Sequence, residues 1–185
     1  MSKLWRGGDD AGKQIPSPPG SSLRLELHFR NGGPSISGMN HTALEDKLGY
    51  RFNNPDLLVQ ALTHPSTDSK PETRRAYERL EFLGDAILQL AVTQYLYHHM
   101  PQSPEGELTQ LRARTVSRAN LGKYGFILGL DKHIALGKGE ERAGGRGKNS
   151  IIANTFESVF GAMSLDSDYE TAKAVALRVI HEALD

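Results

Sequence analysis

YERLEFLGDAILQL, residues 77–90 of the chain, places three carboxylates within an otherwise largely apolar run. Glu78, Glu81 and Asp85 stand at positions i, i+3 and i+7, so on an α-helix they share one face. Like charges on one helix face repel each other by roughly 0.2–0.5 kcal/mol per pair when exposed, and by more where water is excluded. A chain usually keeps such an arrangement for a cation. We therefore expect a helix that is buried on most sides, with one acidic stripe facing a cleft.

Composition narrows the class of protein. The chain has 185 residues, which suits one domain with an appended tail. Its formal net charge of zero argues against a uniformly basic nucleic-acid-binding surface but leaves room for local basic patches. The absence of cysteine excludes disulfides, thiolate metal sites and cysteine nucleophiles. There is neither an apolar run of the roughly 18 residues that a membrane span needs nor a signal-peptide core, so a soluble cytoplasmic protein is expected.

Residues 1–38 are rich in glycine, proline and serine, a composition that cannot bury enough apolar surface to offset the entropy of ordering. We expect a flexible tail over residues 1–38 and a folded domain over residues 39–185. Within the tail, Leu23–Phe29 alternates apolar and polar residues with the period of a strand, but no partner strand is evident.

From residue 41 onward, apolar residues recur at helical spacing, and the sequence predicts an all-α domain without paired strands. Gly49 and Gly125 are expected to end helices, and Asn54 and Ser117 to cap the start of others. The glycine-rich segment 137–149 is expected to be a flexible, basic-leaning loop. The expected helices span about 41–49, 54–63, 74–99, 107–116, 117–125, 150–165 and 170–184.

A second polar pair interrupts the apolar helix expected over residues 150–165. Asn154 and Glu157 are spaced i, i+3 and share a face, opposite in character to their apolar neighbours. Helical bundles build metal sites from side chains on facing helices, here Glu81 and Asp85 on one and this pair on the other. Oxygen ligands without histidine or cysteine suit Mg²⁺ or Mn²⁺, and Mg²⁺ can activate a water for attack on a phosphodiester. Taken singly, either pair could be a solvated carboxylate or a satisfied core amide.

These residues carry a resemblance to the ribonuclease III family. Glu78–Asp85 resembles the family's signature, and four further blocks match in order over residues 41–185: Leu48–Phe52, Ala61–Ser66, Glu105–Leu108 and Ser150–Glu157. The resemblance implies an all-α, homodimeric endonuclease that is specific for double-stranded RNA and acts in rRNA and mRNA processing. Each subunit would cut one strand, leaving a 5′-phosphate, a 3′-hydroxyl and two-nucleotide 3′ overhangs.

The resemblance also implies roles for individual residues. Glu81, Asp85 and Glu157 match the family's Mg²⁺-binding carboxylates, with Asp85 and Glu157 the essential catalytic pair. Asn154 completes the metal site from the second helix. Glu78 and Glu105 match secondary acidic positions of the cleft, which would come from opposite subunits.

Other matches are less specific. Phe82 matches an aromatic residue that inserts into the partner subunit, with an ordinary core phenylalanine as the alternative. His64, before Pro65, is expected to make hydrogen bonds in its loop rather than to act in catalysis. Phosphate contacts, or else a merely solvated basic surface, are expected of Arg112, Arg114, Lys138, Arg146 and Lys148.

The chain departs from the family pattern in two ways. Asn154 stands where much of the family has aspartate; its amide oxygen can ligate Mg²⁺ but brings no charge, so a weaker or differently tuned metal site is expected. The sequence also ends at Asp185, where the nuclease domain ends, without the double-stranded RNA-binding domain that bacterial-type members carry. Either a domain is missing, or the nuclease dimer binds RNA alone, weakly and with strong salt dependence.

Two other functions stay open. A catalytically silent member of the same fold would serve as an RNA-binding or dimerisation module, although the retention of all three carboxylates argues against it. A metal-dependent phosphohydrolase of small nucleotides would act without duplex RNA. No organic cofactor is expected in any of these cases.

Overall fold

The computed structural model describes residues 41–67 and 70–182. The predicted tail over residues 1–38, its strand-like stretch Leu23–Phe29 and the predicted domain boundary lie outside the described residues. Within the described part the chain forms helices joined by short turns, and the only strand-like pairing there is an isolated β-bridge. The prediction of an all-α fold is confirmed.

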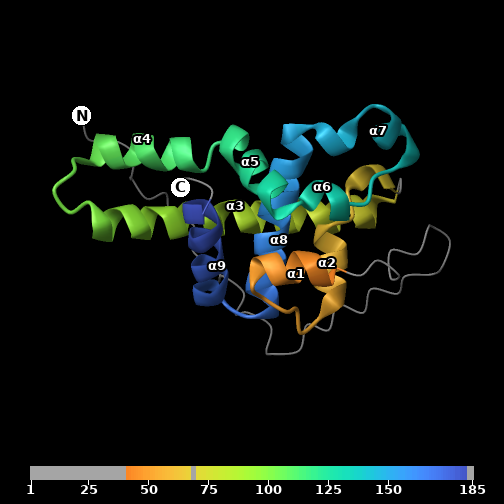
Figure 1. The fold of residues 1–185 in the computed structure, drawn as a ribbon, viewed down its shortest axis with the longest axis horizontal. Coiled ribbons are helices and arrows are strands. Elements are labelled where there is room, and N and C mark those ends of the chain that lie inside the picture. Colours follow the sequence, from red (N-terminus) through yellow and green to blue (C-terminus); the bar gives the residue numbers. More distant parts are fainter. Residues whose placement is uncertain (1–40, 68–69, 183–185) are drawn as a thin grey trace, which may run out of the picture. The chain divides into compact units, whose positions relative to one another are not determined.

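The helices follow one another closely along the chain (Figure 1). Short 3₁₀ turns lie at Pro65–Thr67 and Gly145–Gly147. The α-helices of the described residues are α1 (Thr42–Leu48), α2 (Pro55–Ala61), α3 (Pro71–His99), α4 (Glu105–Thr115), α5 (Arg118–Leu128), α6 (Leu130–His133), α7 (Lys138–Arg142), α8 (Asn149–Asp166) and α9 (Tyr169–Glu182).

Local capping explains where several helices begin. The Asn54 side chain accepts a hydrogen bond from the Asp56 N–H at 3.1 Å, and Pro55 occupies the first turn of α2, as predicted. Ser117 caps α5 by accepting from the Asn120 N–H at 3.4 Å. The start of α3 lies at Pro71, three residues before the predicted start, because proline is favoured in the first turn of a helix.

One predicted helix end was wrong. The helix expected to stop at Gly125 continues to Leu128, and its cap is Gly129, whose φ of 80° is left-handed. Gly125 serves packing instead, since a Cβ there would lie 2.5 Å from Cγ2 of Ile152 on α8. Gly49 does end α1, with a φ of 56°.

The prediction of a flexible loop over residues 137–149 was also wrong. Part of this segment forms α7, and side chains fasten the rest. Arg146 pairs with Glu141 at 2.6 Å and donates to the Ile134 carbonyl at 2.9 Å. Lys148 pairs with Glu140 at 2.7 Å. These contacts stabilise a glycine-rich stretch whose composition alone suggests disorder.

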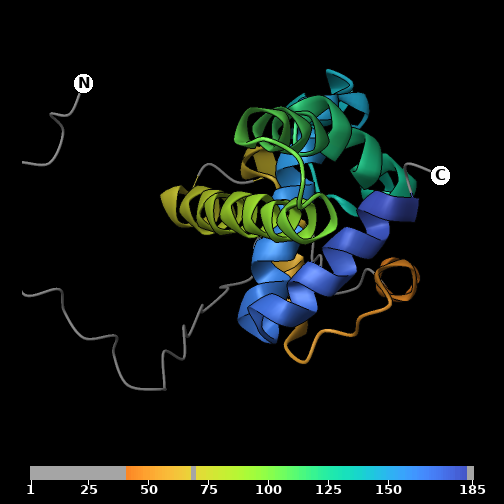
Figure 2. The same cartoon turned by 90° about the vertical axis from the view of Figure 1, so that its left-hand side faces the viewer.

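Helix α8 forms the centre of the fold and packs against α3, α5, α2 and α9 (Figures 1 and 2). Apolar residues surround it on all sides, which is typical of a helix enclosed by others. Its buried residues are Ile151, Ile152, Ala153, Thr155, Phe156, Ser158, Val159, Phe160, Gly161, Ala162 and Met163. The few polar side chains that α8 directs outward are therefore held by a rigid core.

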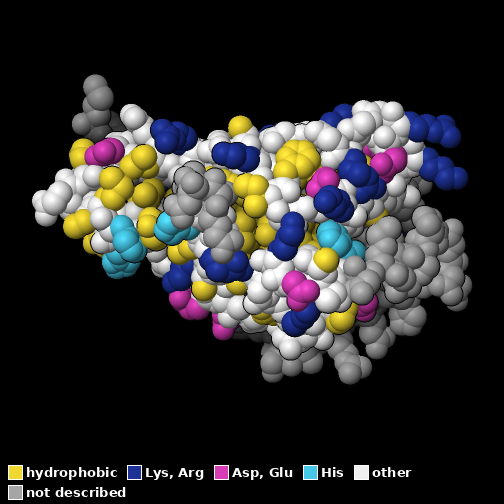
Figure 3. All heavy atoms as spheres, in the orientation of Figure 1, with side chains coloured by type: hydrophobic (Ala, Val, Ile, Leu, Met, Phe, Trp, Pro, Cys, Tyr) yellow, Lys and Arg dark blue, Asp and Glu magenta, His cyan; other side chains and the backbone are white. Residues whose placement is uncertain are grey.

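Helix α3 is less buried than the sequence suggested. One side packs on the core through residues such as Leu80, Ile87 and Leu88, but Phe82 is 80% exposed and Leu90 47% exposed. Apolar side chains gather on the face shown in Figure 3, over the region where α3 and α4 lie side by side. The expectation of a helix buried on most sides was wrong, and α3 has an unpartnered apolar face instead. None of the described helices combines the length and apolarity that crossing a bilayer requires.

Candidate active site

The acidic face of α3 opens onto a hollow of about 560 Å³. Glu81 and Asp85 are half-buried along its wall, whereas Glu78 is 57% exposed at its edge and pairs with Arg74 at 3.4 Å. The Asp85 carboxylate accepts hydrogen bonds from Nε2 of Gln89 at 3.2 and 3.3 Å. The three predicted carboxylates therefore share one face, with Glu78 peripheral to the other two.

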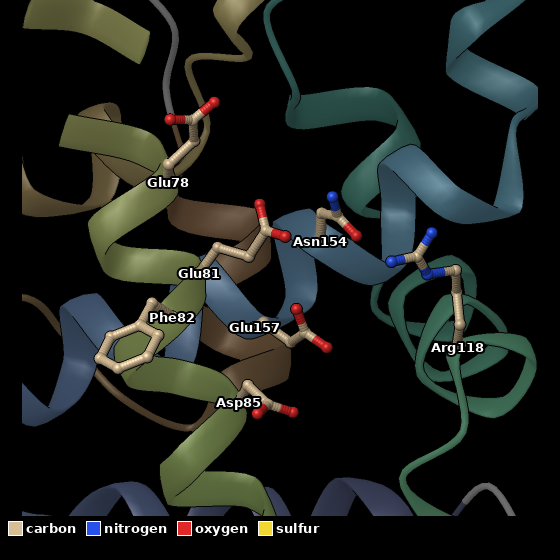
Figure 4. Close-up of a pocket in the computed structure, with 7 residues that line it drawn as sticks. All are labelled: Glu78, Glu81, Phe82, Asp85, Arg118, Asn154 and Glu157. Atoms are coloured by element: carbon tan, nitrogen blue, oxygen red, sulfur yellow. The ribbon is translucent and has the colours of Figure 1, made fainter. Parts of the chain in front are cut away.

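Helix α8 supplies the opposite wall of this hollow. Asn154 and Glu157, both half-buried, point into it, as Glu81 and Asp85 do from α3 (Figure 4). The four residues expected to form a metal site are thus brought together from two helices, although Asp85 and Asn154 lie 69 positions apart in the sequence (85 to 154). The lining residues are Glu78, Glu81, Phe82, Asp85, Arg118, Asn154 and Glu157.

Two glycines allow the helices to come this close. A Cβ added to Gly84 of α3 would lie 1.8 Å from the Glu157 carbonyl oxygen, and one added to Gly161 of α8 would lie 2.1 Å from the Leu80 carbonyl oxygen. Only glycine permits backbones to meet at such a distance. Because Gly84 directly precedes Asp85 and contacts the backbone of Glu157, the same contact sets the distance between the two carboxylates.

A buried hydrogen bond fastens the same pair of helices nearby. The Tyr77 hydroxyl of α3 lies 3.0 Å from Oγ1 of Thr155 on α8, and Thr155 donates its own proton to the Ile151 carbonyl at 2.8 Å. Tyr77 is therefore the donor. This bond and the glycine contacts hold the walls of the hollow in one arrangement.

The carboxylates of the hollow repel one another. Burial, and then the charges of Asp85 and Glu81, raise the pKa of Glu157 to about 7, while Arg118 opposes the shift. Burial also raises the pKa of Glu81, and the charge of Arg118 and a hydrogen bond from Asn154 oppose it. A divalent cation would relieve this repulsion.

The residues fit a hard cation. Three carboxylates and one amide oxygen, without histidine, are the donors that Mg²⁺ and Mn²⁺ accept. Over residues 41–67 and 70–182, no three acidic or histidine side chains are already gathered tightly enough to form a complete metal-binding group. Mutual repulsion explains such spacing, and Mg²⁺ tolerates it because it keeps several water ligands.

Phe82 lies at the rim of the hollow with its ring directed away from the core (Figure 4). At 80% exposure it is not a core residue, so that alternative was wrong. A large aromatic side chain in this position is more typical of a contact surface than of a solvated helix face.

A second hollow, of about 220 Å³, lies between α3 and α4. It contains two predicted residues that the first hollow lacks, Glu105 and Arg112. Glu105 accepts from the Thr109 hydroxyl at 2.8 Å, and Arg112 donates to the Thr93 hydroxyl at 3.3 Å. Glu105 and Glu78 therefore do not line the same hollow within one copy of the chain.

The remaining predicted residues lie outside both hollows. Arg114 and Lys138 are exposed, while Arg146 and Lys148 are held in the ion pairs of the α7 region. His64 makes the expected local hydrogen bonds: its Nδ1 lies 2.8 Å from the Ser66 hydroxyl and accepts from the Ser66 N–H at 3.1 Å.

The sequence prediction missed Arg118, the basic residue that lines the acidic hollow. It is the first residue of α5, directly after the Ser117 cap, and its side chain is exposed. The only signal in the sequence was a basic residue at a helix start, where helix dipoles disfavour positive charge. That signal is too weak to identify a site residue without knowing where α5 lies.

Comparison with known proteins defines the class of this chain. The family model described as Ribonuclease-III-like matches residues 54–184. The chain belongs to the ribonuclease-III-like family.

Individual relatives agree with this assignment. Ribonuclease 3 of Carboxydothermus hydrogenoformans is 44% identical over 147 residues, covering 78% of this chain and 63% of the relative. Ribonuclease 3 of Protochlamydia amoebophila is 41% identical over 144 residues, covering 77% and 60%. The chain thus spans about three-fifths of the length of these curated relatives.

A solved structure supports the fold. The nuclease domain of ribonuclease III from Campylobacter jejuni, described for structural flexibility in a region involved in dimer formation, has a TM-score of 0.74 and 40% sequence identity. The match covers 78% of this chain and 98% of that domain. The predicted ribonuclease III nuclease-domain fold is confirmed.

Proposed function

We propose that the chain is an endoribonuclease that hydrolyses phosphodiester bonds of double-stranded RNA and depends on Mg²⁺, for which Mn²⁺ substitutes. The observation that carries this proposal is the convergence of Glu81, Asp85, Asn154 and Glu157 on one open hollow, in a chain of the ribonuclease-III-like family. The hollow is open to solvent, so these residues are accessible to a substrate.

Asp85 and Glu157 are the essential pair, and Glu81 and Asn154 complete the metal-binding set. When bound, the cation supplies Lewis-acid chemistry that polarises the phosphodiester and lowers the pKa of water. The chain's part is positional: the contact at Gly84 fixes the two essential carboxylates relative to each other, and Asn154 shares the hollow with Glu81 and opposes the rise in its pKa. Such preorganisation lowers the cost of arranging charge during the reaction.

Two copies of the chain assemble through the exposed apolar face of α3. Phe82 is an exposed aromatic residue on that face. The partner's Phe82 inserts into the second hollow, which is lined in part by Leu96, Tyr97 and Leu108. Phe82 borders the acidic hollow, and Glu105 borders the second hollow. Insertion of Phe82 from one copy into the second hollow of the other therefore brings Glu105 of that other copy close to the acidic hollow of the first. Glu78 and Glu105 would then line one cleft from opposite subunits.

A dimer of this kind carries one centre per subunit, and each centre cuts one strand. The products have a 5′-phosphate, a 3′-hydroxyl and two-nucleotide 3′ overhangs, and the biological role is in rRNA and mRNA processing in the cytoplasm. Arg112, Arg114 and Lys138 are available to contact phosphates. Arg146 and Lys148 would have to exchange their ion pairs with Glu141 and Glu140 for contacts with RNA.

A substrate panel tests the proposal. The chain is incubated with Mg²⁺ and an end-labelled RNA duplex, the two single strands, or free nucleotides, and the product ends are mapped. Cleavage of the duplex alone, with staggered ends, is expected. Hydrolysis of free nucleotides without duplex cleavage would indicate a small-molecule phosphohydrolase, and duplex binding without cleavage would indicate a silent RNA-binding module.

A further inference from the structure

We infer that Arg118 is a phosphate-binding residue of this site, whose guanidinium holds the RNA phosphodiester that lies against the carboxylates and their cation. This inference rests on the proposed nuclease function and adds a residue that the carboxylate signature does not contain.

The position of Arg118 is the first observation. Its side chain extends from α5 toward the hollow, across from α3 and beside Asn154 and Glu157 (Figure 4). Among the described residues that line the hollow, it is the sole basic one. It therefore faces the place where an anionic substrate must enter an otherwise acidic site.

The second observation is that Arg118 has no ion-pair partner among the described residues, although acidic side chains surround the hollow. Its charge acts on Glu157 and Glu81 from a distance and opposes the rise that burial causes in the pKa of both. By contrast, Arg146 is paired and bonded to backbone carbonyls. The Arg118 guanidinium thus keeps its five N–H donors for a ligand.

The negative charge of the hollow explains why a phosphodiester needs a basic residue in order to bind there. With all four carboxylates ionised, as around a bound cation, the carboxylates and one guanidinium give the lining residues a formal charge of −3, and one divalent cation raises this to −1. A phosphodiester, itself −1, would still be repelled by the α3 wall. A guanidinium on the opposite wall offers a fork of donors that matches two phosphate oxygens, in a place that the carboxylates do not occupy.

A rival role for Arg118 predicts the opposite behaviour toward metal. If Arg118 served only to hold the carboxylates in place, its loss would weaken cation binding. If it binds phosphate, its loss removes a positive charge that repels the cation, so cation affinity stays the same or rises. Metal affinity measured without RNA therefore separates the two roles.

The experiment compares the wild type with Arg118→Gln, Arg118→Lys and the control Lys123→Gln, an exposed cation of the same helix that does not line the hollow. Mn²⁺ affinity is measured by calorimetry without RNA. Duplex binding is measured by fluorescence anisotropy in EDTA across a salt series. Single-turnover cleavage is measured in Mg²⁺, and thermal unfolding checks that each variant is folded.

For Arg118→Gln we expect unchanged or tighter Mn²⁺ binding, a salt slope of duplex binding smaller by about one, and a cleavage rate lower by about 10–100-fold. Arg118→Lys should restore the salt slope but only part of the rate, since lysine keeps the charge without the fork. Lys123→Gln should match the wild type. Weaker Mn²⁺ binding, or unchanged duplex binding and cleavage, in Arg118→Gln would overturn the inference.

A failure of the nuclease proposal looks different. In that case the wild type itself leaves the duplex intact, and the salt slope in EDTA still decides whether Arg118 contacts phosphate.

Discussion

Replacing Glu157 with glutamine should stabilise the metal-free protein at neutral and alkaline pH, although it removes an essential residue. Burial and neighbouring carboxylates raise the pKa of Glu157 from 4.5 to about 7. Below pH 4.5 the side chain is neutral in the folded and unfolded chains, so it costs nothing. As pH rises from 4.5 to 7 the unfolded chain ionises first, and the folded state loses stability. Above pH 7 the loss is complete.

The size of this effect follows from the same values. Raising a carboxyl pKa from 4.5 to about 7 corresponds to a ceiling of about 3.4 kcal/mol. Glu157 borders an open hollow, so solvent screening reduces the expected loss to about 1–2 kcal/mol. For a domain of this size, that is a difference in Tm of about 3–8 °C.

The assay is thermal unfolding in EDTA between pH 4.5 and pH 8, with the wild type, Glu157→Gln and Glu107→Gln compared. Glu107 is an exposed carboxylate of α4 outside the hollow and serves as the control. Glu157→Gln should equal the wild type at pH 4.5 and exceed it at pH 8. Added Mg²⁺ should reverse the order at pH 8, because only the wild type keeps the full ligand set. A variant no more stable than the wild type in EDTA at pH 8 would refute the reasoning.

Three further perturbations test the geometry. In denaturant titrations, Gly84→Ala should lower the free energy of unfolding by about 2 kcal/mol or more, because its Cβ would lie 1.8 Å from the Glu157 carbonyl oxygen. The control Gly139→Ala, with open space around the added Cβ, should leave the free energy of unfolding nearly unchanged. Phe82→Ala should raise the dimer dissociation constant in sedimentation; an unchanged dimer would remove Phe82 from the interface. Asn154→Asp adds a negative charge, so it should bind Mg²⁺ about tenfold more tightly in calorimetry. In EDTA the same charge repels its neighbours and should lower the Tm. Equal Mg²⁺ affinity would mean that the amide position lies outside the metal site.

The site residues were largely predictable because they follow two patterns of helical spacing in the sequence. Acidic side chains at helical spacing on α3, and a polar pair within the apolar α8, each indicate a face. The structure places Glu81, Asp85, Asn154 and Glu157 on one hollow, as the spacing implied. Whether they bind metal stays a prediction.

What the sequence did not reveal depends on contacts between distant segments. Arg118 became a site residue only through the position of α5, and Gly84 stood in the acidic stretch without an evident role until the contact with α8 gave it one. The segment 137–149 looked flexible because glycine content is a local signal, while the Arg146 and Lys148 pairs that order it are not. Likewise, Gly125 and Gly129 are equally good helix ends by composition, and only packing against Ile152 distinguishes them.

The most direct test of the metal-site proposal is single-turnover cleavage of an end-labelled RNA duplex in Mg²⁺ by the wild type and by Glu157→Gln. We predict cleavage by the wild type that EDTA abolishes, and a rate at least about a hundredfold lower for Glu157→Gln despite unimpaired folding. Duplex cleavage by Glu157→Gln at the wild-type rate, or cleavage by the wild type that persists in EDTA, would contradict the assignment of this hollow as the active site.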